Sequence, residues 1–175
     1  MANPVFDAAR TVLAVREYAD RPIPDDALDR IVEAAHLTAS AGNQQPWHFV
    51  VVRDRATLGR LAGLVRSAPY VGGAAAAIVV AGRRESAFAV SDVSRAIQTM
   101  VLTAWGEGIG SNWTGSPGME GVRDAVGIPA AYDVVAVVPL GYPLRDIGRG
   151  LKRRRPLAEV ASAEQFGTPY RPGAS

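Results

Sequence analysis

The chain has 175 residues, with 19 lysine and arginine residues, 17 aspartate and glutamate residues and no cysteine. We interpret residues 1–175 as a single domain, which is long enough to bury roughly 70% of its unfolded surface. The lack of cysteine excludes disulfides, thiolate nucleophiles and cysteine-ligated metals, so redox chemistry requires a bound cofactor. The N-terminus has no signal-peptide plan and no apolar run could span a bilayer, so we expect a cytoplasmic protein without a membrane partner.

The first two predicted elements are helices separated by an extended segment. Residues 4–15 carry apolar side chains on one helical face, which predicts an amphipathic helix. The prolines in residues 20–24 end this helix and lead the chain out in an extended form. Asp25 and Asp26 then favour a new helix, because carboxylates interact with the free amides and the positive end of the helix dipole. The apolar stripe of this second helix is formed by Leu28, Ile31, Val32 and Ala35.

A small, amide-rich loop follows, with the sequence S-A-G-N-Q-Q-P-W-H-F at residues 40–49, and runs into three valines. Its aromatic and β-branched second half predicts a buried strand. In its first half, small side chains let a flat ligand approach the backbone, and amides offer donors and acceptors to a heteroaromatic edge. An ordinary loop between a helix and a strand has a similar composition, so both interpretations stay open at this point. The candidate ligand-binding residues are Ser40, Ala41, Gly42, Asn43 and Gln45.

The remainder of the chain predicts two more core strands and three more helices. Residues 75–81 and 134–140 are apolar runs of strand length. Residues 56–65 and 119–126 predict short helices. Residues 90–105 predict a long helix that is apolar over much of its circumference, so we expect it to be central or to lie at an interface.

Two segments suggest ligand binding by composition. The sequence G-E-G-I-G-S at residues 106–111 resembles a dinucleotide-binding fingerprint, but it follows a helix instead of a strand, so we reject a Rossmann site. The second segment contains Lys152, Arg153, Arg154 and Arg155, followed by Pro-Leu. Its charge alone predicts a solvated tail or a phosphate or nucleic-acid patch. Nucleic-acid binding needs contacts spread along a face, so we expect no nucleic-acid partner.

Four motifs in chain order resemble those of the nitroreductase family, in which the enzymes depend on flavin. They are the bend V-R-E-Y at residues 15–18, the loop at residues 40–49, the segment G-I-G-S-N-W-T-G at residues 108–115, and the ending of G-Y-P at 141–143 with K-R-R-R-P-L at 152–157. The resemblance implies an α+β fold with a mostly antiparallel sheet surrounded by helices. It also implies a homodimer that buries one FMN per interface.

The resemblance further implies an oxidoreductase in which hydride passes from NAD(P)H through N5 of FMN to a nitroaromatic, quinone or similar small acceptor. The cofactor would carry this chemistry, which agrees with the lack of a conspicuous catalytic acid. We assign no catalytic side chain and no metal ligand. Two alternatives stay open: a family member that uses a deazaflavin or modifies a ring, and a non-catalytic flavin-binding protein.

By the same resemblance, particular residues gain roles toward FMN. Arg16 matches a basic residue of the phosphate-binding arm, whereas the family's other basic residue falls on Val12 or Leu13 and its hydroxyl on Ala14. Half of that arm is therefore missing. The remaining candidates are Ser40, Ala41, Gly42, Asn43 and Gln45 near the ring, Gln98 on the long helix, Thr114 and Gly115 near N5, and Arg153 and Arg155 at the phosphate.

Overall fold

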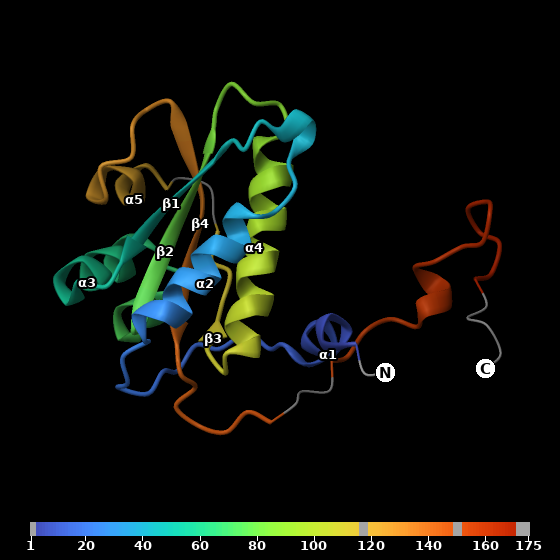
Figure 1. Ribbon diagram of the computed structural model, residues 1–175, viewed down its shortest axis with the longest axis horizontal. Helices are drawn as coiled ribbons and strands as arrows, with labels where there is room; N and C mark the ends of the chain where they lie inside the picture. The colour runs from blue at the N-terminus through green and yellow to red at the C-terminus, as the bar shows by residue number, and fades with distance from the viewer. Residues whose placement is uncertain (1–2, 116–118, 149–151, 171–175) are drawn as a thin grey trace.

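The computed structural model describes residues 3–115, 119–148 and 152–170 (Figure 1). Its helices are α1 (Pro4–Thr11), α2 (Asp25–His36), α3 (Arg55–Leu64), α4 (Ala89–Gly106) and α5 (Glu120–Ala125). Short 3-10 helices lie at η1 (Ala41–Asn43), η2 (Pro69–Gly73) and η3 (Leu157–Glu159). Its strands are β1 (Trp47–Val52), β2 (Ala76–Arg83), β3 (Gly110–Ser111) and β4 (Tyr132–Gly141).

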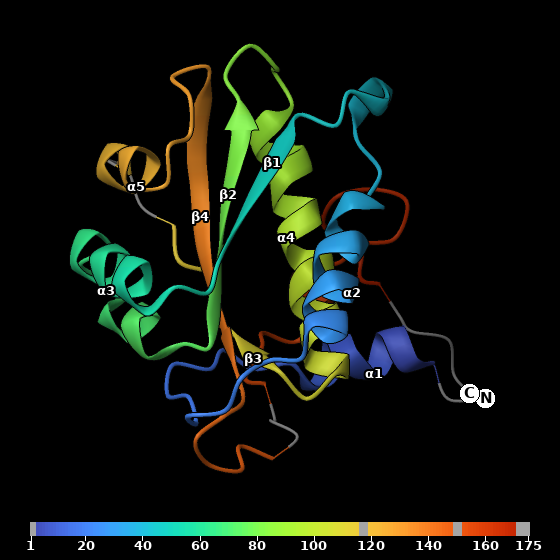
Figure 2. The same ribbon diagram turned by 60° about the vertical axis from the view of Figure 1, so that its left-hand side comes forward.

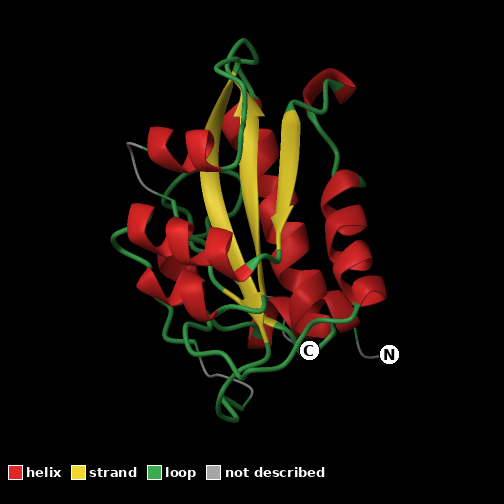
Figure 3. Ribbon diagram, turned by 90° about the vertical axis from the view of Figure 1, so that its left-hand side faces the viewer, coloured by secondary structure: helices red, strands yellow, loops and turns green. Residues whose placement is uncertain are grey.

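These strands form one sheet with helices on both faces. The strand order is β1-β2-β4-β3, and each neighbouring pair is antiparallel. Helices α2 and α4 pack on one face, and α3, η2 and α5 pack on the other (Figures 2 and 3). The expected α+β fold with an antiparallel sheet surrounded by helices is confirmed.

Strand β2 lies in the middle of this sandwich, and its sequence reflects that position. Every residue from Ala76 to Gly82 is buried. Because successive side chains point to opposite faces, Ile78 and Val80 pack toward α2 and α4, whereas Ala77 and Val79 pack toward α3 and α5. A strand that is covered on both faces has no polar side, which explains the uninterrupted apolar run.

The N-terminal helix is shorter than the sequence predicts. It ends at Thr11 instead of Val15, because the chain turns there and runs alongside β3: Ala14 forms a parallel bridge with Ser111, and the Val15 N–H donates to the Ser111 carbonyl at 2.9 Å. The apolar side chains of Val5 and Phe6 are exposed, so the predicted apolar face of this helix does not pack into the core of its own chain. The sequence also does not predict β3, because a strand of two residues is too short to show an alternation of apolar and polar side chains.

Helix α4 is central, as expected, but only part of its surface is covered. Val93, Ile97 and Met100 are completely buried against the sheet and α2. On other sides of the helix Leu102 is half-buried and Gln98 is exposed. The surface of α4 that remains for contact with a second copy includes Gln98 and Leu102, whereas Met100 belongs to the core of this chain.

The C-terminal segment, residues 152–170, leaves the body of the molecule next to α1 (Figure 1). Lys152 Nζ donates to the carbonyl of Ala9 in the last turn of α1, where a cation is favourable. Beyond it, Leu157, Val160 and Phe166 are exposed. Among the described residues, no helix combines the length and the apolar character needed to cross a membrane.

Candidate cofactor site

The amide-rich loop adopts one well-defined shape that its sequence explains. Gly42, Asn43 and Gln45 have φ values of 55°, 55° and 48°, in the left-handed region that glycine and asparagine accept more readily than other residues. The Ser40 hydroxyl accepts a hydrogen bond from the Gln45 N–H at 2.9 Å and closes the loop. The backbone of this loop is thus bent, and the side chains of Asn43 and Gln45 are exposed just before the start of β1.

A buried carboxylate anchors the loop to α4. Asp92 is completely buried, and its Oδ2 accepts a hydrogen bond from the Ala41 N–H at 3.1 Å. Its other oxygen pairs with the Arg95 guanidinium one turn later. A buried charge is tolerated only when it is paired and hydrogen-bonded, as this one is. These contacts agree with a structural role for Asp92.

The side-chain amides of the loop are exposed and partly bonded to each other. Gln45 Nε2 donates to Asn43 Oδ1 at 3.1 Å. Within the described residues, Asn43 Nδ2 and Gln45 Oε1 have no hydrogen-bond partner, which leaves one donor and one acceptor facing outward. This pair could bind a heteroaromatic edge that alternates acceptors and donors.

A second group of polar side chains gathers beside β3 and β4. The hydroxyls of Tyr70 and Thr114 are 3.1 Å apart, and Asn112 Nδ2 donates to Tyr70 Oη. The Arg16 guanidinium lies over the Tyr70 ring, with its central carbon 6.0 Å from the ring centroid. We call Arg16, Tyr70, Asn112 and Thr114 the polar cluster. It brings together two residues that the sequence singled out, Arg16 and Thr114, from positions almost a hundred residues apart.

The backbone around Thr114 limits which groups can face a ligand. The Thr114 N–H donates to the Val137 carbonyl at 3.1 Å, and the Val137 N–H donates back at 2.8 Å. The Thr114 amide is therefore occupied, and any contact from this turn to a ligand must use another group, such as the Gly115 amide. A Cβ on residue 115 would lie 2.8 Å from the Val135 carbonyl oxygen, so this close approach to β4 requires glycine.

Tyr18 lies beside the polar cluster and stays protonated. Burial raises the pKa of the Tyr18 phenol, and the nearby Tyr70 raises it further, whereas the positive charge of Arg16 acts in the opposite direction. The Tyr18 hydroxyl donates to the Val15 carbonyl at 2.8 Å and so holds the bend that carries Arg16.

The loop and the polar cluster lie apart along the chain's own sheet. The Pro46 carbonyl accepts from the Arg83 N–H at 2.8 Å, and Arg83 pairs with Tyr132, whereas Thr114 of the cluster pairs with Val137. The stretch of β4 from Tyr132 to Val137 spans roughly 17 Å at about 3.4 Å per residue. In Figure 1 the loop is the cyan turn at the upper end of α4, and β3 is at the lower end.

The remaining sequence candidates belong to neither group. Gln98 is exposed on α4, between the two ends. Arg153 and Arg155 are exposed on the segment that leaves the body, where the carbonyl of Arg153 accepts from Arg154 Nη1. Sequence reasoning missed Tyr70 and Asn112. Asn112 could have been found from its place inside the glycine-rich motif, whereas Tyr70 lies in a segment with no motif at all.

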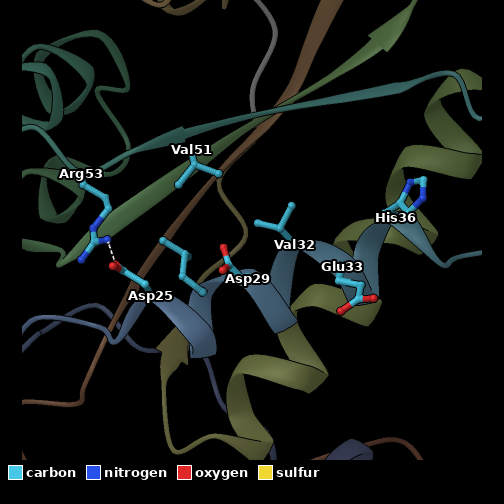
Figure 4. A pocket seen from close by; sticks show the side chains of 8 residues that line it. Asp25, Asp29, Val32, Glu33, His36, Val51 and Arg53 are labelled. Carbon is cyan, nitrogen blue, oxygen red and sulfur yellow. Dashed lines mark hydrogen bonds and ion pairs between the residues drawn. The ribbon is translucent and has the colours of Figure 1, made fainter.

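A hollow of about 740 Å³ lies between α2 and the edge strand β1 (Figure 4). Arg53 from the end of β1 pairs with Asp25, and Asp29, Glu33 and His36 line the helical side. None of the sequence candidates lines this hollow. In the part of the chain that the structure describes, no three His, Asp or Glu side chains are arranged to hold a metal ion.

Comparisons with known proteins identify relatives of this chain. A model of the nitroreductase family matches residues 10–80 and 66–142. A relative from Archaeoglobus fulgidus, provisionally named an NADH dehydrogenase/NAD(P)H nitroreductase, is 41% identical over 139 residues, which are 74% of this chain and 80% of the relative. A crystal structure of a similarly named protein from Bacteroides thetaiotaomicron has a TM-score of 0.87 and 28% identity, covering 95% of this chain and all of that one. A nitroreductase-like protein from Desulfovibrio desulfuricans, solved in complex with FMN, has a TM-score of 0.81 and 30% identity, covering 95% of this chain and 99% of that one.

Proposed function

This chain belongs to the nitroreductase family, and we propose that it is an FMN-dependent oxidoreductase that uses NAD(P)H to reduce a nitroaromatic, a quinone or a similar small acceptor. The family and the FMN-bound relative support a flavin-dependent oxidoreductase. The observation that carries the proposal further is the polar cluster, in which Arg16 and Thr114 from two separate family motifs are joined through Tyr70.

The residues present fit FMN in chemical terms. Asn43 Nδ2 and Gln45 Oε1 provide a donor and an acceptor that match the alternating edge of the flavin's pyrimidine ring. Arg16 supplies a guanidinium for the phosphate, together with Arg153 and Arg155. Because the usual second basic residue and hydroxyl of the N-terminal arm are absent, the C-terminal arginines would carry more of the phosphate contact than usual.

Bound FMN supplies the redox chemistry, taking two electrons and a proton from the nicotinamide and passing them to the acceptor. The chain's own part is to position the ring and stabilise charge. The Gly115 amide is the donor that we assign to the reactive edge of the ring, since the Thr114 amide is occupied by Val137. This amide would stabilise negative charge on the reduced ring, while Arg16 would hold the phosphate.

We further propose that each FMN site is assembled from two chains. Roughly 17 Å along β4, together with the width of β2, separates the loop from Thr114, which is too far for one ring system to touch both within a chain. A second copy, related by a twofold axis, can bring its loop to the cluster of the first. The exposed Val5 and Phe6 on α1 and the half-buried Leu102 on α4 offer apolar surface for this contact.

The absorption spectrum of the purified protein tests the proposed cofactor and reaction together. We expect the visible bands of oxidised FMN, and we expect NAD(P)H to bleach them under anaerobic conditions until an acceptor is added. A deazaflavin, which the incomplete phosphate arm leaves as the second candidate, absorbs at shorter wavelength. A protein that is purified without a chromophore and takes up no FMN would contradict the proposal.

Mixing two damaged chains tests whether the site is shared. Arg16→Ala damages the cluster, and Asn43→Leu damages the loop by removing the amide and adding backbone strain, so each variant homodimer has two damaged sites. In a mixed dimer one site receives both intact groups, and random pairing should restore about a quarter of the wild-type number of intact sites. If the site lies within one chain, co-expression restores none.

A further inference from the structure

Tyr70 is the residue through which the polar cluster is connected. Its hydroxyl is bonded to Thr114 and accepts from Asn112, and its ring lies beneath the Arg16 guanidinium. Arg16 and Thr114 have no contact of their own among the described hydrogen bonds and ion pairs, so Tyr70 is what links the two motifs.

The backbone of Tyr70 is held firmly by the core on the α3 side of the sheet. Tyr70 belongs to η2. Ala68, just before η2, and Val71, the residue after Tyr70, are completely buried. The Val71 N–H donates to the Ala68 carbonyl at 3.1 Å, and the Ala68 N–H donates to the Val65 carbonyl at 2.8 Å. The tyrosine side chain therefore extends from a fixed point toward the cluster, as a positioning residue requires.

The hydrogen bonds within the polar cluster leave one hydroxyl hydrogen available to a ligand. Asn112 Nδ2 donates to Tyr70 Oη and, at 3.4 Å, to Thr114 Oγ1. The two hydroxyls share one hydrogen bond, so one of their two hydrogens takes part in it. The other hydrogen has no acceptor among the described residues and is free to donate to a ligand or to water.

We propose that Tyr70 is a positioning residue of the cofactor site, which fixes the Asn112–Thr114 turn and the Arg16 guanidinium relative to one another. This inference rests on the proposed function, because the two groups matter together only if one cofactor meets both. Tyr70 itself need not touch the reacting atoms. Its effect is on how strongly the site favours the reduced, more negative cofactor over the oxidised one, since the donors of the Asn112–Thr114 turn stabilise added negative charge.

Two substitutions separate the two contacts of Tyr70. Tyr70→Phe keeps the ring beneath Arg16 but removes both hydroxyl bonds, whereas Tyr70→Leu removes the ring as well. The matched control is Tyr132→Phe. Tyr132 also has an arginine over its ring, with the central guanidinium carbon of Arg83 5.6 Å from the ring centroid, and it accepts from Arg83 Nη2 at 3.2 Å, but it has no contact with the polar cluster among the described interactions.

The midpoint potential of the bound flavin is the main measurement. For Tyr70→Phe we expect reduced FMN to lose about tenfold more affinity than oxidised FMN, which lowers a two-electron potential by about 30 mV. For Tyr70→Leu we expect the same decrease and, in addition, a loss of affinity for FMN that exceeds the loss for riboflavin, since Arg16 is then free to move. The control should keep the wild-type potential and affinity.

A double-substitution cycle keeps the inference testable if one variant is poorly folded. Thr114→Val removes the other hydroxyl of the pair, so Tyr70→Phe, Thr114→Val and the double variant should lower the potential by similar amounts instead of additively. If the wild type binds flavin but Tyr70→Phe and Tyr70→Leu have its potential and affinity, this inference is wrong and the proposed function stands. If the wild type binds no flavin, both are wrong.

Discussion

The amide-rich loop and the polar cluster are built by different physical means. The loop owes its shape to left-handed backbone conformations within six residues and to one buried carboxylate below it. The cluster is assembled from side chains on three distant segments, the bend at Arg16, η2 and the turn after β3. The loop depends mainly on contacts between residues that are close in sequence, whereas the cluster forms only when three distant segments pack together.

Each chain forms its own loop and its own cluster, and in our proposal the association of two chains places the loop of one beside the cluster of the other. The largest effect should therefore come from breaking the contact between chains. Phe6→Asp combined with Leu102→Asp places charges on the apolar surface of α1 and α4. Met100→Asp would instead bury a charge in the core of the chain. We expect a folded monomer whose FMN affinity falls by more than about a hundredfold, because contacts of about 1–3 kcal/mol each are lost from the loop.

Light scattering and circular dichroism together check this prediction, the first for size and the second for folding. Leu64→Asp is the matched control, since Leu64 is an exposed apolar residue on α3, on the opposite face of the sheet. A wild-type protein that is monomeric and loaded with flavin at micromolar concentration would exclude a shared site.

The next effect concerns the anchor of the loop. Asp92→Ala leaves the Ala41 N–H and Arg95 without their partner, and we expect a loss of about 2–4 kcal/mol in the free energy of unfolding, measured with urea. Asp124→Ala, which breaks an exposed pair with Arg123, should cost no more than about 0.5 kcal/mol. Equal costs for the two variants would mean that the buried carboxylate does not hold the loop.

A smaller effect should separate the phosphate end of the site from its ring end. If the exposed Arg155 binds the FMN phosphate, Arg155→Ala removes a charged contact of about 1.5–3 kcal/mol and weakens FMN binding by about ten- to a hundredfold. Riboflavin, which lacks the phosphate, should bind this variant and the wild type equally well in fluorescence titrations. Wild-type affinity for FMN in both Arg153→Ala and Arg155→Ala would leave the segment without a role in binding.

The smallest effect is expected at the loop itself. Asn43→Gly removes the amide but keeps the left-handed backbone conformation, whereas Asn43→Leu would also add backbone strain. We expect Asn43→Gly to weaken FMN and riboflavin binding alike by about fivefold, since one exposed hydrogen bond contributes about 1 kcal/mol. A loss for FMN alone in the same titration would place Asn43 at the phosphate instead of the ring.

The sequence by itself determined the elements that local patterns encode. The continuous apolar run at residues 75–81 predicted a buried strand, and the spacing in residues 90–105 predicted the central helix. Family motifs, read in order, predicted the antiparallel sheet and pointed to Arg16 and Thr114. The predictions of the strand and the helix succeeded because side-chain periodicity depends only on near neighbours in the chain.

The tertiary structure decided what depends on distant contacts. The end of α1 at Thr11 follows from the pairing of Ala14 and Val15 with Ser111, and no sequence pattern near Thr11 predicts that pairing. Only the fold brings Tyr70 against Thr114, and only the fold separates the loop from the cluster along β4. The physical reason is the same in each case: a hydrogen bond or a ring contact between remote segments is set by how the sheet and helices pack, and that packing leaves no mark on the local sequence.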